Sequence, residues 1–219
     1  MEVAIVDYGL GNLFSVKHAC SRVGLDAEIT SSGEAIIKAD AVILPGVGAF
    51  GDAMENLQKL DLIEPLHDAA RFKPLMGICL GMQLLMSESE EFGNYKGLGI
   101  IPGRSVRFEN PIGEGGRAMK VPHVGWNQIL SATKNYSVSD WDQSLLKGIG
   151  EGEYMYFVHS FYVQVDDRSV EHSISTYGNI EFCSSLRLKQ IFASQFHPER
   201  SGVSGLRIYH NFKNMIHNK

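Results

Sequence analysis

The stretch Gly77-Ile78-Cys79-Leu80-Gly81 lies where a short apolar run, residues 74–78, passes without a loop into a helix-like run, residues 80–86. A small residue stands two places on either side of Cys79. This is the nucleophile-elbow pattern with cysteine in place of serine. The turn forces its central residue into a strained backbone conformation that small neighbours permit, and it holds the side chain at the carboxyl edge of the sheet. Cys79 is therefore the predicted nucleophile.

Upstream of this elbow, short apolar runs alternate with amphipathic ones. Strands are predicted at residues 3–6, 27–30 and 41–44, and helices at 13–23, 33–39 and 49–71. Asn12 is expected to cap the first helix and Gly24 to end it. Strands that alternate with helices indicate a mostly parallel central sheet covered on both faces, as in flavodoxin-like α/β folds.

Downstream of Glu91 the sequence becomes rich in glycine and proline, and the apolar runs shorten. Strand-like runs at 105–108, 118–121, 154–165 and 191–195 predict an antiparallel extension of the sheet. Residues 110–116 predict an exposed loop, and 205–216 a closing helix that buries Leu206, Tyr209, Phe212 and Ile216. Because no linker or repeat interrupts the chain, a single domain over residues 1–219 is expected.

The bulk composition excludes several classes of function. The chain has 219 residues, of which 44% are hydrophobic and 21% charged, which suits a globular fold with one sizeable core. The formal charge is -5 and the 20 basic residues are scattered, so a nucleic-acid surface is not expected. The expected partner is a small molecule or another protein.

The apolar runs and the cysteines point to the compartment. No run of about 18 apolar residues is present and no apolar leader follows Met1, so the interpretation is a soluble, cytoplasmic protein without a membrane partner. Cys20, Cys79 and Cys183 lie far apart, without the paired spacing of a zinc site, and an odd count suits a reducing compartment. Cys20 and Cys183 are expected to be buried fillers, and neither a metal nor an organic cofactor is predicted.

The segment Gln195-Phe196-His197-Pro198-Glu199 follows the apolar run 191–193. In extended chain, His197 and Glu199 would leave on the same side, which lets one carboxylate hold one imidazole. Such a carboxylate fixes the tautomer and raises the basicity of the ring, so that its other nitrogen takes the thiol proton. A lone histidine near a strand end is more often structural, but the acidic residue and the separate nucleophile favour a Cys79, His197 and Glu199 triad.

Acyl transfer also needs donors for the developing oxyanion. The backbone amide of Leu80, first in the predicted helix, is one candidate, and that of Val47 or Gly48 in the turn Pro45-Gly46-Val47-Gly48 is the other. The glycines let the backbone turn its amides toward a substrate. Taken alone, this turn would more readily be interpreted as an ordinary turn after a strand.

Together, the three segments resemble those of the class I, triad-type glutamine amidotransferases, in the same order and over nearly the whole chain. Further stretches narrow the match: Asp7 to Asn12, Gly97 to Gly103, Val121 to Asn127, and Tyr156 to Ser160. They are similar to the glutaminase subunits of imidazole glycerol phosphate synthase. In that branch the partner is a (β/α)8-barrel cyclase, and the two subunits form a heterodimer of the histidine pathway.

The resemblance implies hydrolysis of glutamine to glutamate and ammonia without a cofactor, and passage of the ammonia to the cyclase, where lyase chemistry follows. It also implies further site residues. Those expected to hold the amino-acid head group are Gln83 and the backbone around Gly48, His159 and Ser160. Those expected to face the partner are Asn12, Trp126, Tyr156 and Arg200.

Other functions stay open at this stage. Residues 90–96 and 182–185 look closer to a paralogous branch that supplies ammonia to a nucleotide-sugar amidotransferase in surface-polysaccharide (O-antigen) synthesis. A stand-alone γ-glutamyl hydrolase or peptidase on the same fold would need no partner, and the stretches that resemble a docking surface argue against it. A catalytically inactive subunit is disfavoured because all three triad residues are present.

Overall fold

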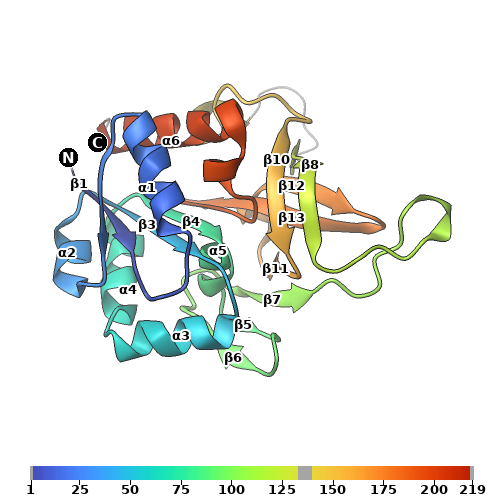
Figure 1. The fold of residues 1–219 in the computed structure, drawn as a ribbon, viewed down its shortest axis with the longest axis horizontal. Helices are drawn as coiled ribbons and strands as arrows, with labels where there is room; N and C mark the ends of the chain where they lie inside the picture. Colours follow the sequence, from blue (N-terminus) through green and yellow to red (C-terminus); the bar gives the residue numbers. More distant parts are fainter. Residues whose placement is uncertain (1, 133–139, 218–219) are drawn as a thin grey trace.

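The structure is a computed structural model, in which residues 2–132 and 140–217 are described. Its centre is an eight-stranded sheet in the order β2-β1-β3-β4-β14-β13-β12-β9 (Figure 1). The parallel part consists of β1 (Glu2–Val6), β2 (Asp26–Thr30), β3 (Ala41–Gly46), β4 (Leu75–Cys79) and β14 (Ile191–Ser194). The antiparallel part consists of β13 (Ile180–Leu188), β12 (Glu171–Tyr177) and β9 (Leu130–Ser131). The predicted fold class is confirmed.

Helices cover both faces of the parallel part. One face carries α1 (Leu13–Arg22) and α6 (Gly202–His217). The other carries α2 (Gly33–Lys38), α3 (Phe50–Lys59), α4 (Ile63–Phe72) and α5 (Leu80–Leu84). Successive side chains of a strand point to opposite faces, so Val3 and Ile5 join the first layer, whereas Ala4 and Val6 join the second. This double burial explains why the parallel strands are continuous apolar runs.

Two smaller sheets flank the antiparallel end. β8 (His123–Gln128) pairs with β10 (Tyr154–His159), and a second sheet has the order β11 (Phe161–Val165), β7 (Gly103–Arg107), β5 (Glu88–Ser89) and β6 (Tyr95–Lys96). Four short 3-10 helices complete the elements of the described residues: η1 (Glu114–Gly116), η2 (Asp140–Gln143), η3 (Arg168–Val170) and η4 (Pro198–Arg200). β10 and β11 are separated only by Ser160, so this residue joins the two smaller sheets.

Several predicted elements differ from the structure. The predicted helix 49–71 is two helices, because the chain turns at Asp61, whose φ is +55°. The predicted strand 118–121 was wrong, since Ala118 makes only an isolated bridge to Ile112. The predicted strand 154–165 is divided at Ser160 between two sheets. Asn12 stands at the N-cap position of α1, but its side chain makes no capping bond within the described part of the chain.

The remaining expectations about surface and core hold with small changes. Residues 110–116 project from the body in Figure 1 and are mostly exposed, although Pro111 is buried. α6 buries Tyr209, Phe212 and Ile216 as expected, whereas Leu206 is only partly buried. Cys20 and Cys183 are buried and unpaired, as predicted. Among the helices described, none is long and apolar enough to cross a membrane.

Candidate active site

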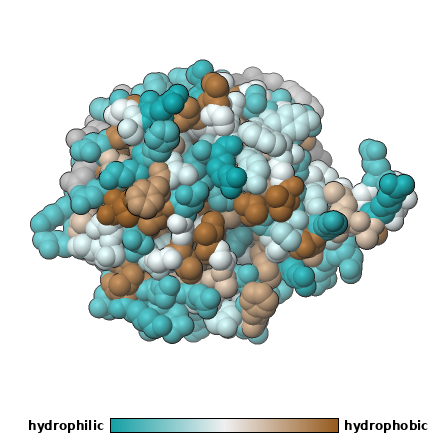
Figure 2. All heavy atoms as spheres, viewed as in Figure 1, coloured by the Kyte–Doolittle hydropathy of each residue, from teal (hydrophilic) through white to brown (hydrophobic). Residues whose placement is uncertain are grey.

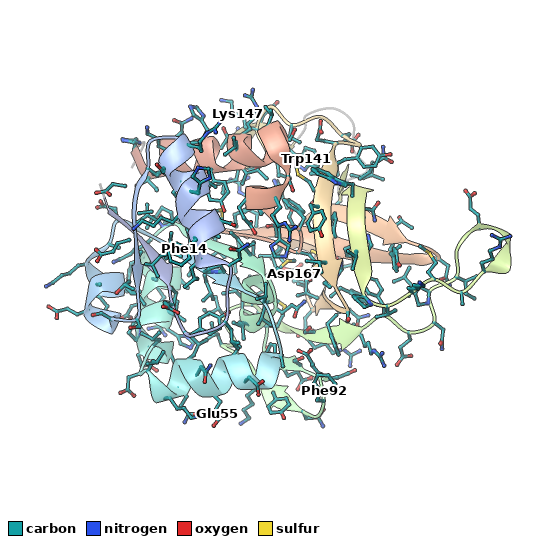
Figure 3. The ribbon with its side chains drawn as sticks, viewed as in Figure 1. Phe14, Glu55, Phe92, Trp141, Lys147 and Asp167 are labelled. Atoms are coloured by element: carbon teal, nitrogen blue, oxygen red, sulfur yellow. The ribbon has the colours of Figure 1, made fainter. Side chains whose placement is uncertain are left out.

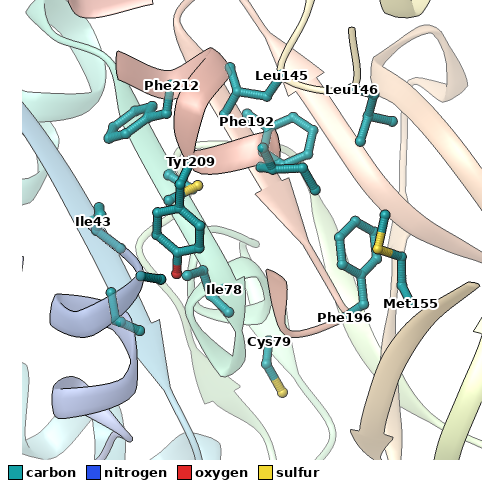
Figure 4. Packing of buried hydrophobic residues seen from close by; sticks show 14 of the residues in the cluster. Ile43, Ile78, Cys79, Leu145, Leu146, Met155, Phe192, Phe196, Tyr209 and Phe212 are labelled. Carbon is teal, nitrogen blue, oxygen red and sulfur yellow. The ribbon is translucent and has the colours of Figure 1, made fainter. Parts of the chain in front are cut away.

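Cys79 lies at the junction of β4 and α5 with φ 54° and ψ -108°, the strained conformation expected of a nucleophile elbow. The flanking glycines are required by close packing. A Cβ on Gly81 would lie 1.8 Å from the carbonyl oxygen of Leu44, and one on Gly77 would lie 3.0 Å from the Cβ of Ala193. Figure 4 shows Cys79 at the edge of the buried cluster, with its sulfur pointing away from the labelled aromatic rings.

His197 and Glu199 meet beside the elbow. Nδ1 of His197 lies 2.8 Å from Oε1 of Glu199, and both side chains are almost completely buried. The extended geometry predicted for this pair was wrong. His197 is extended, but the chain turns into η4 at Pro198, so the turn brings the carboxylate back to the ring. The amide of His197 also donates to the Tyr156 carbonyl at 2.9 Å, which anchors the pair to β10.

The charges of this group favour an ion pair with the nucleophile. Burial lowers the pKa of His197, but the adjacent Cys79 and the Glu199 carboxylate outweigh it and raise the pKa to about 10. Nε2 of His197 and Oε2 of Glu199 are buried and have no hydrogen-bond partner among the described residues. An imidazolium whose Nε2 hydrogen is uncommitted beside a cysteine is arranged to stabilise a thiolate and to deliver a proton.

Besides His197, the sulfur of Cys79 has polar neighbours in Gln195 and Val158. Nε2 of Gln195 donates to Sγ across 3.6 Å, and Sγ lies 3.8 Å from the carbonyl oxygen of Val158. Gln195 is completely buried. Its amide donor therefore supports negative charge on the sulfur, in addition to the imidazolium.

A pocket of about 250 Å³ opens in front of Cys79. Its lining includes every residue predicted to bind the oxyanion or the amino-acid head group: Val47, Gly48, Leu80, Gln83, His159 and Ser160. Leu80 is the first residue of α5, so its amide is one that the helix itself does not use. Gly48 has φ +104°, a conformation in which glycine is favoured. The backbone geometry thus places amides from two turns at one pocket.

The side chains of Gln83 and His159 are partly committed to the protein. Nε2 of Gln83 donates to the carbonyl of Phe161 at 3.0 Å and to Oε1 of Gln195 at 3.2 Å. The ring of His159 contacts the Phe161 carbonyl through Nδ1 at 2.8 Å and His123 through Nε2 at 3.0 Å. Oε1 of Gln83 takes no part in these bonds, whereas the backbone carbonyl of Ser160 accepts from the amide of Phe108 at 3.0 Å.

The pocket also contains a carboxylate that sequence reasoning missed. Glu91 lines it, and Oε2 of Glu91 accepts a hydrogen bond from the amide of Phe50 at 2.7 Å. Burial raises the pKa of Glu91. Glu91 follows the short strand β5 in an irregular segment, so no periodicity or motif spacing pointed to it. Its place in the pocket depends on the small sheet that contains β5.

Three of the four predicted partner-facing residues form one surface cluster. The guanidinium of Arg200 lies 4.4 Å from the centre of the Tyr156 ring, and the Trp126 and Tyr156 rings are 6.0 Å apart. Trp126 is 55% exposed. Asn12 is exposed at the start of α1, which packs against η4.

Further apolar side chains are exposed near these elements. Val124 of β8 is 56% exposed, and Phe14, labelled in Figure 3, projects from α1 with 82% exposed. Figure 2 shows brown apolar groups distributed over this side of the molecule. Large exposed apolar side chains around a site entrance are typical of a protein interface.

Comparison with known proteins identifies the family. Residues 4–215 match the model of "Glutamine amidotransferase class-I". The chain belongs to the class I glutamine amidotransferases. Among members of this family, "Imidazole glycerol phosphate synthase subunit HisH" of Geobacter sulfurreducens is 43% identical, over 98% of this chain and 99% of that relative. The HisH subunit of Archaeoglobus fulgidus is 46% identical, over 98% of each chain.

A solved structure agrees in fold. PurLQS from Thermotoga maritima superposes with a TM-score of 0.68 at 16% identity, covering 97% of each chain. At this identity the likeness concerns the fold alone. Like other class I glutamine amidotransferases, the chain is an enzyme.

Proposed function

We propose that this chain is the glutaminase subunit of an imidazole glycerol phosphate synthase and supplies ammonia for histidine biosynthesis. The observation that carries the proposal is the buried His197 and Glu199 pair at 2.8 Å, next to the strained Cys79. Relatives that bear the name of this subunit match at 43–46% identity over nearly the whole chain. They favour the histidine pathway over polysaccharide synthesis and over a stand-alone hydrolase.

The first half-reaction forms a thioester. The Cys79 thiolate attacks the side-chain carbonyl carbon of glutamine, and the amides of Leu80 and of Val47 or Gly48 stabilise the oxyanion. The carbon–nitrogen bond then breaks while Nε2 of the His197 imidazolium gives its proton to the departing nitrogen. Ammonia leaves, and the glutamyl group stays on the sulfur.

The second half-reaction restores the enzyme. His197, now neutral, takes a proton from water, and the hydroxide equivalent adds to the thioester carbonyl. Collapse of the tetrahedral intermediate releases glutamate and returns the electron pair to the Cys79 sulfur. Glu199 holds the ring through Nδ1 in both steps and stabilises its positive charge.

The pocket fits the amino-acid end of glutamine. The Glu91 carboxylate lines the wall and would pair with the α-ammonium group, and Oε1 of Gln83 would accept from the same group. The backbone at His159 and Ser160 would hold the α-carboxylate. Glu91→Gln is expected to raise the KM for glutamine about tenfold with a small change in kcat, because a ground-state ion pair is lost. Steady-state kinetics would measure this, and an unchanged KM would remove Glu91 from the binding site.

The cluster of Trp126, Tyr156 and Arg200, with the exposed Val124 and Phe14, would form the surface for the synthase partner. We infer a (β/α)8-barrel cyclase in a heterodimer, whose barrel would receive ammonia before bulk water protonates it. Exposed aromatic and arginine side chains are enriched at such interfaces.

The test is glutamate release by the purified chain, alone and with the cyclase subunit, with and without the ribulosyl imidazole precursor. We expect slow turnover alone and strong stimulation by the complex with that ligand. Stimulation by a nucleotide-sugar amidotransferase, and none by the cyclase, would assign the chain to polysaccharide synthesis. Full activity of the free chain without any partner would contradict a subunit role.

A further inference from the structure

A series of hydrogen bonds begins on the inner side of β8 and ends at the pocket wall. Nδ2 of Asn127 lies 3.5 Å from Nε2 of His123, and Nδ1 of His123 lies 3.0 Å from Nε2 of His159. Nδ1 of His159 then lies 2.8 Å from the carbonyl oxygen of Phe161. The series thus connects β8 and β10, which form one sheet, with β11 of another sheet.

The donor and the acceptor of each bond follow from the groups at the two ends of the series. Oδ1 of Asn127 accepts from the amide of Gln128 at 2.8 Å and Nδ2 donates to the Thr176 carbonyl at 2.9 Å, which orients the side-chain amide. Nδ2 must therefore donate to His123, so Nε2 of His123 is the acceptor and Nδ1 the donor. A carbonyl can only accept, so His159 donates from Nδ1 and accepts at Nε2. Both histidines are neutral, each in one tautomer.

The series continues from Phe161 to the nucleophile. The same Phe161 carbonyl accepts from Nε2 of Gln83 at 3.0 Å, and this nitrogen also donates to Oε1 of Gln195 at 3.2 Å. Nε2 of Gln195 then donates to Sγ of Cys79 at 3.6 Å. We refer to Asn127, His123, His159, Gln83 and Gln195, with the Phe161 carbonyl, as the β8–Cys79 network.

The interior part of this network is tightly enclosed. The His123 ring stacks on Tyr177 at 4.2 Å and on Phe157 at 5.2 Å between centres. Burial lowers the pKa of His123 to about 4 and that of His159 to about 3. A fully satisfied polar network in a closed environment is rigid, and removing one member leaves the next without a partner.

The outer side of the same strand belongs to the proposed partner surface. Side chains alternate along β8, so Val124 and Trp126 are exposed while His123 is buried. A partner that binds the outward side chains of β8 therefore also contacts the strand whose inward side chains include His123.

We propose that His123 and His159 are positioning residues of the glutaminase site, which transmit the shape of β8 to the Phe161 carbonyl and, through Gln83 and Gln195, to the Cys79 thiol. Neither imidazole needs to touch glutamine in this role. The proposal rests on the proposed glutaminase function for its kinetic readout. The reactivity of the thiol toward an alkylating agent is independent of that function.

The test compares two substitutions at one position. His123→Phe keeps a flat ring between Tyr177 and Phe157 but removes both hydrogen bonds, whereas His123→Gln retains a donor and an acceptor. The matched control is His172→Phe, which removes another buried, hydrogen-bonded histidine, 2.7 Å from the Ser144 hydroxyl, outside the network. Each variant is measured by iodoacetamide alkylation of Cys79 and by kcat and KM for glutamine in the complex with the cyclase subunit.

We expect His123→Phe to slow alkylation about tenfold and to lower kcat more than it raises KM, with His123→Gln restoring most of both. His172→Phe is expected to lose stability while alkylating at the wild-type rate. Alkylation of His123→Phe at the wild-type rate would overturn the proposal. If His123→Phe does not fold, Asn127→Leu gives a second comparison: it removes the first bond of the network, together with the Asn127 bonds to Thr176 and Gln128, and leaves both histidines in place. Glutamine hydrolysis by Cys79→Ala would refute the proposed function instead.

Discussion

His197 lies next to Cys79, and His159 lines the pocket in front of Cys79. The two are buried to a similar depth, with 4% and 6% of their surfaces exposed, but their pKa values shift in opposite directions. The pKa of His197 is raised to about 10, and that of His159 is lowered to about 3. Burial disfavours the charged form of both rings. The neighbours make the difference. His197 has the Glu199 carboxylate and the Cys79 sulfur, whereas His159 has a backbone carbonyl, His123 and the like charge of His197.

This contrast separates two tasks within one site. A reacting group must exchange a proton, so it benefits from a charged partner and an uncommitted nitrogen. A positioning group is more rigid when both of its nitrogens are committed to neutral partners. The two histidines show that depth of burial does not by itself distinguish these tasks.

The largest expected effect of the contrast between the two histidines is on kcat. We expect Cys79→Ala and His197→Ala to lower kcat by about a thousandfold or more, and Glu199→Gln to lower it less, because the carboxylate orients the ring and does not react. His159→Gln, which removes a ring that only positions, should retain more activity than any of these. Steady-state glutaminase assays measure all four, and equal losses across the triad would contradict the division of roles.

A second test concerns stability against pH. His123 and His159 have folded-state pKa values of about 4 and about 3, below the ordinary value of 6.5. At a pH between the folded-state pKa of each histidine and 6.5, the unfolded chain binds protons that the folded chain does not. The free energy of unfolding is therefore highest above pH 6.5 and decreases as the pH falls. Each histidine contributes a slope of up to about 1.4 kcal/mol per pH unit.

Urea unfolding between pH 4.5 and 6.5 measures this slope. His123→Gln cannot titrate there, so its free energy of unfolding should fall less steeply with decreasing pH than that of the wild type. Parallel slopes for the two proteins would show that His123 titrates normally in the folded state.

The smallest expected effect is on the titration of His197. In Cys79→Ser the sulfur that favours the imidazolium is absent, so the pKa of His197 should fall from about 10, while the Glu199 carboxylate still supports the charged form. Nitrogen-15 NMR of the imidazole ring follows this titration. The signals of His172, which lies outside the β8–Cys79 network, serve as the internal control and should not change. An unaltered His197 titration would mean that Cys79 does not set the charge of His197.

The parallel half of the fold could be predicted because its strands are buried on both faces and are therefore apolar throughout. β12 and β13 were missed for the opposite reason. They bury hydroxyl side chains, including Ser173, Ser175, Ser184 and Ser185, which a hydrophobic pattern does not register. Ser173 shares hydrogen bonds of 2.9 and 2.6 Å with Ser184 and Ser185, so the strands satisfy these groups across the sheet.

The candidate site likewise has parts that the sequence predicted and parts that it did not. The elbow around Cys79 and the segment that ends at Glu199 are local patterns, and sequence alone was enough to select them. Their meeting depends on η4, a turn that the sequence argument did not foresee. Glu91 and His123 enter the site only because the smaller sheets bring distant segments together, and no spacing along the chain encodes that.

The alternation of side chains along β8 also determines which changes in its coding sequence the protein can tolerate. β8 is six residues long, and its side chains point alternately to the protein interior and to the exposed side. Point mutations change one position at a time and leave the rest in place. Insertion or deletion of a single codon in the middle of the strand would reverse the orientation of every later residue, burying Trp126 and exposing Asn127. The length of this segment should therefore be inherited more strictly than the identity of its outward residues.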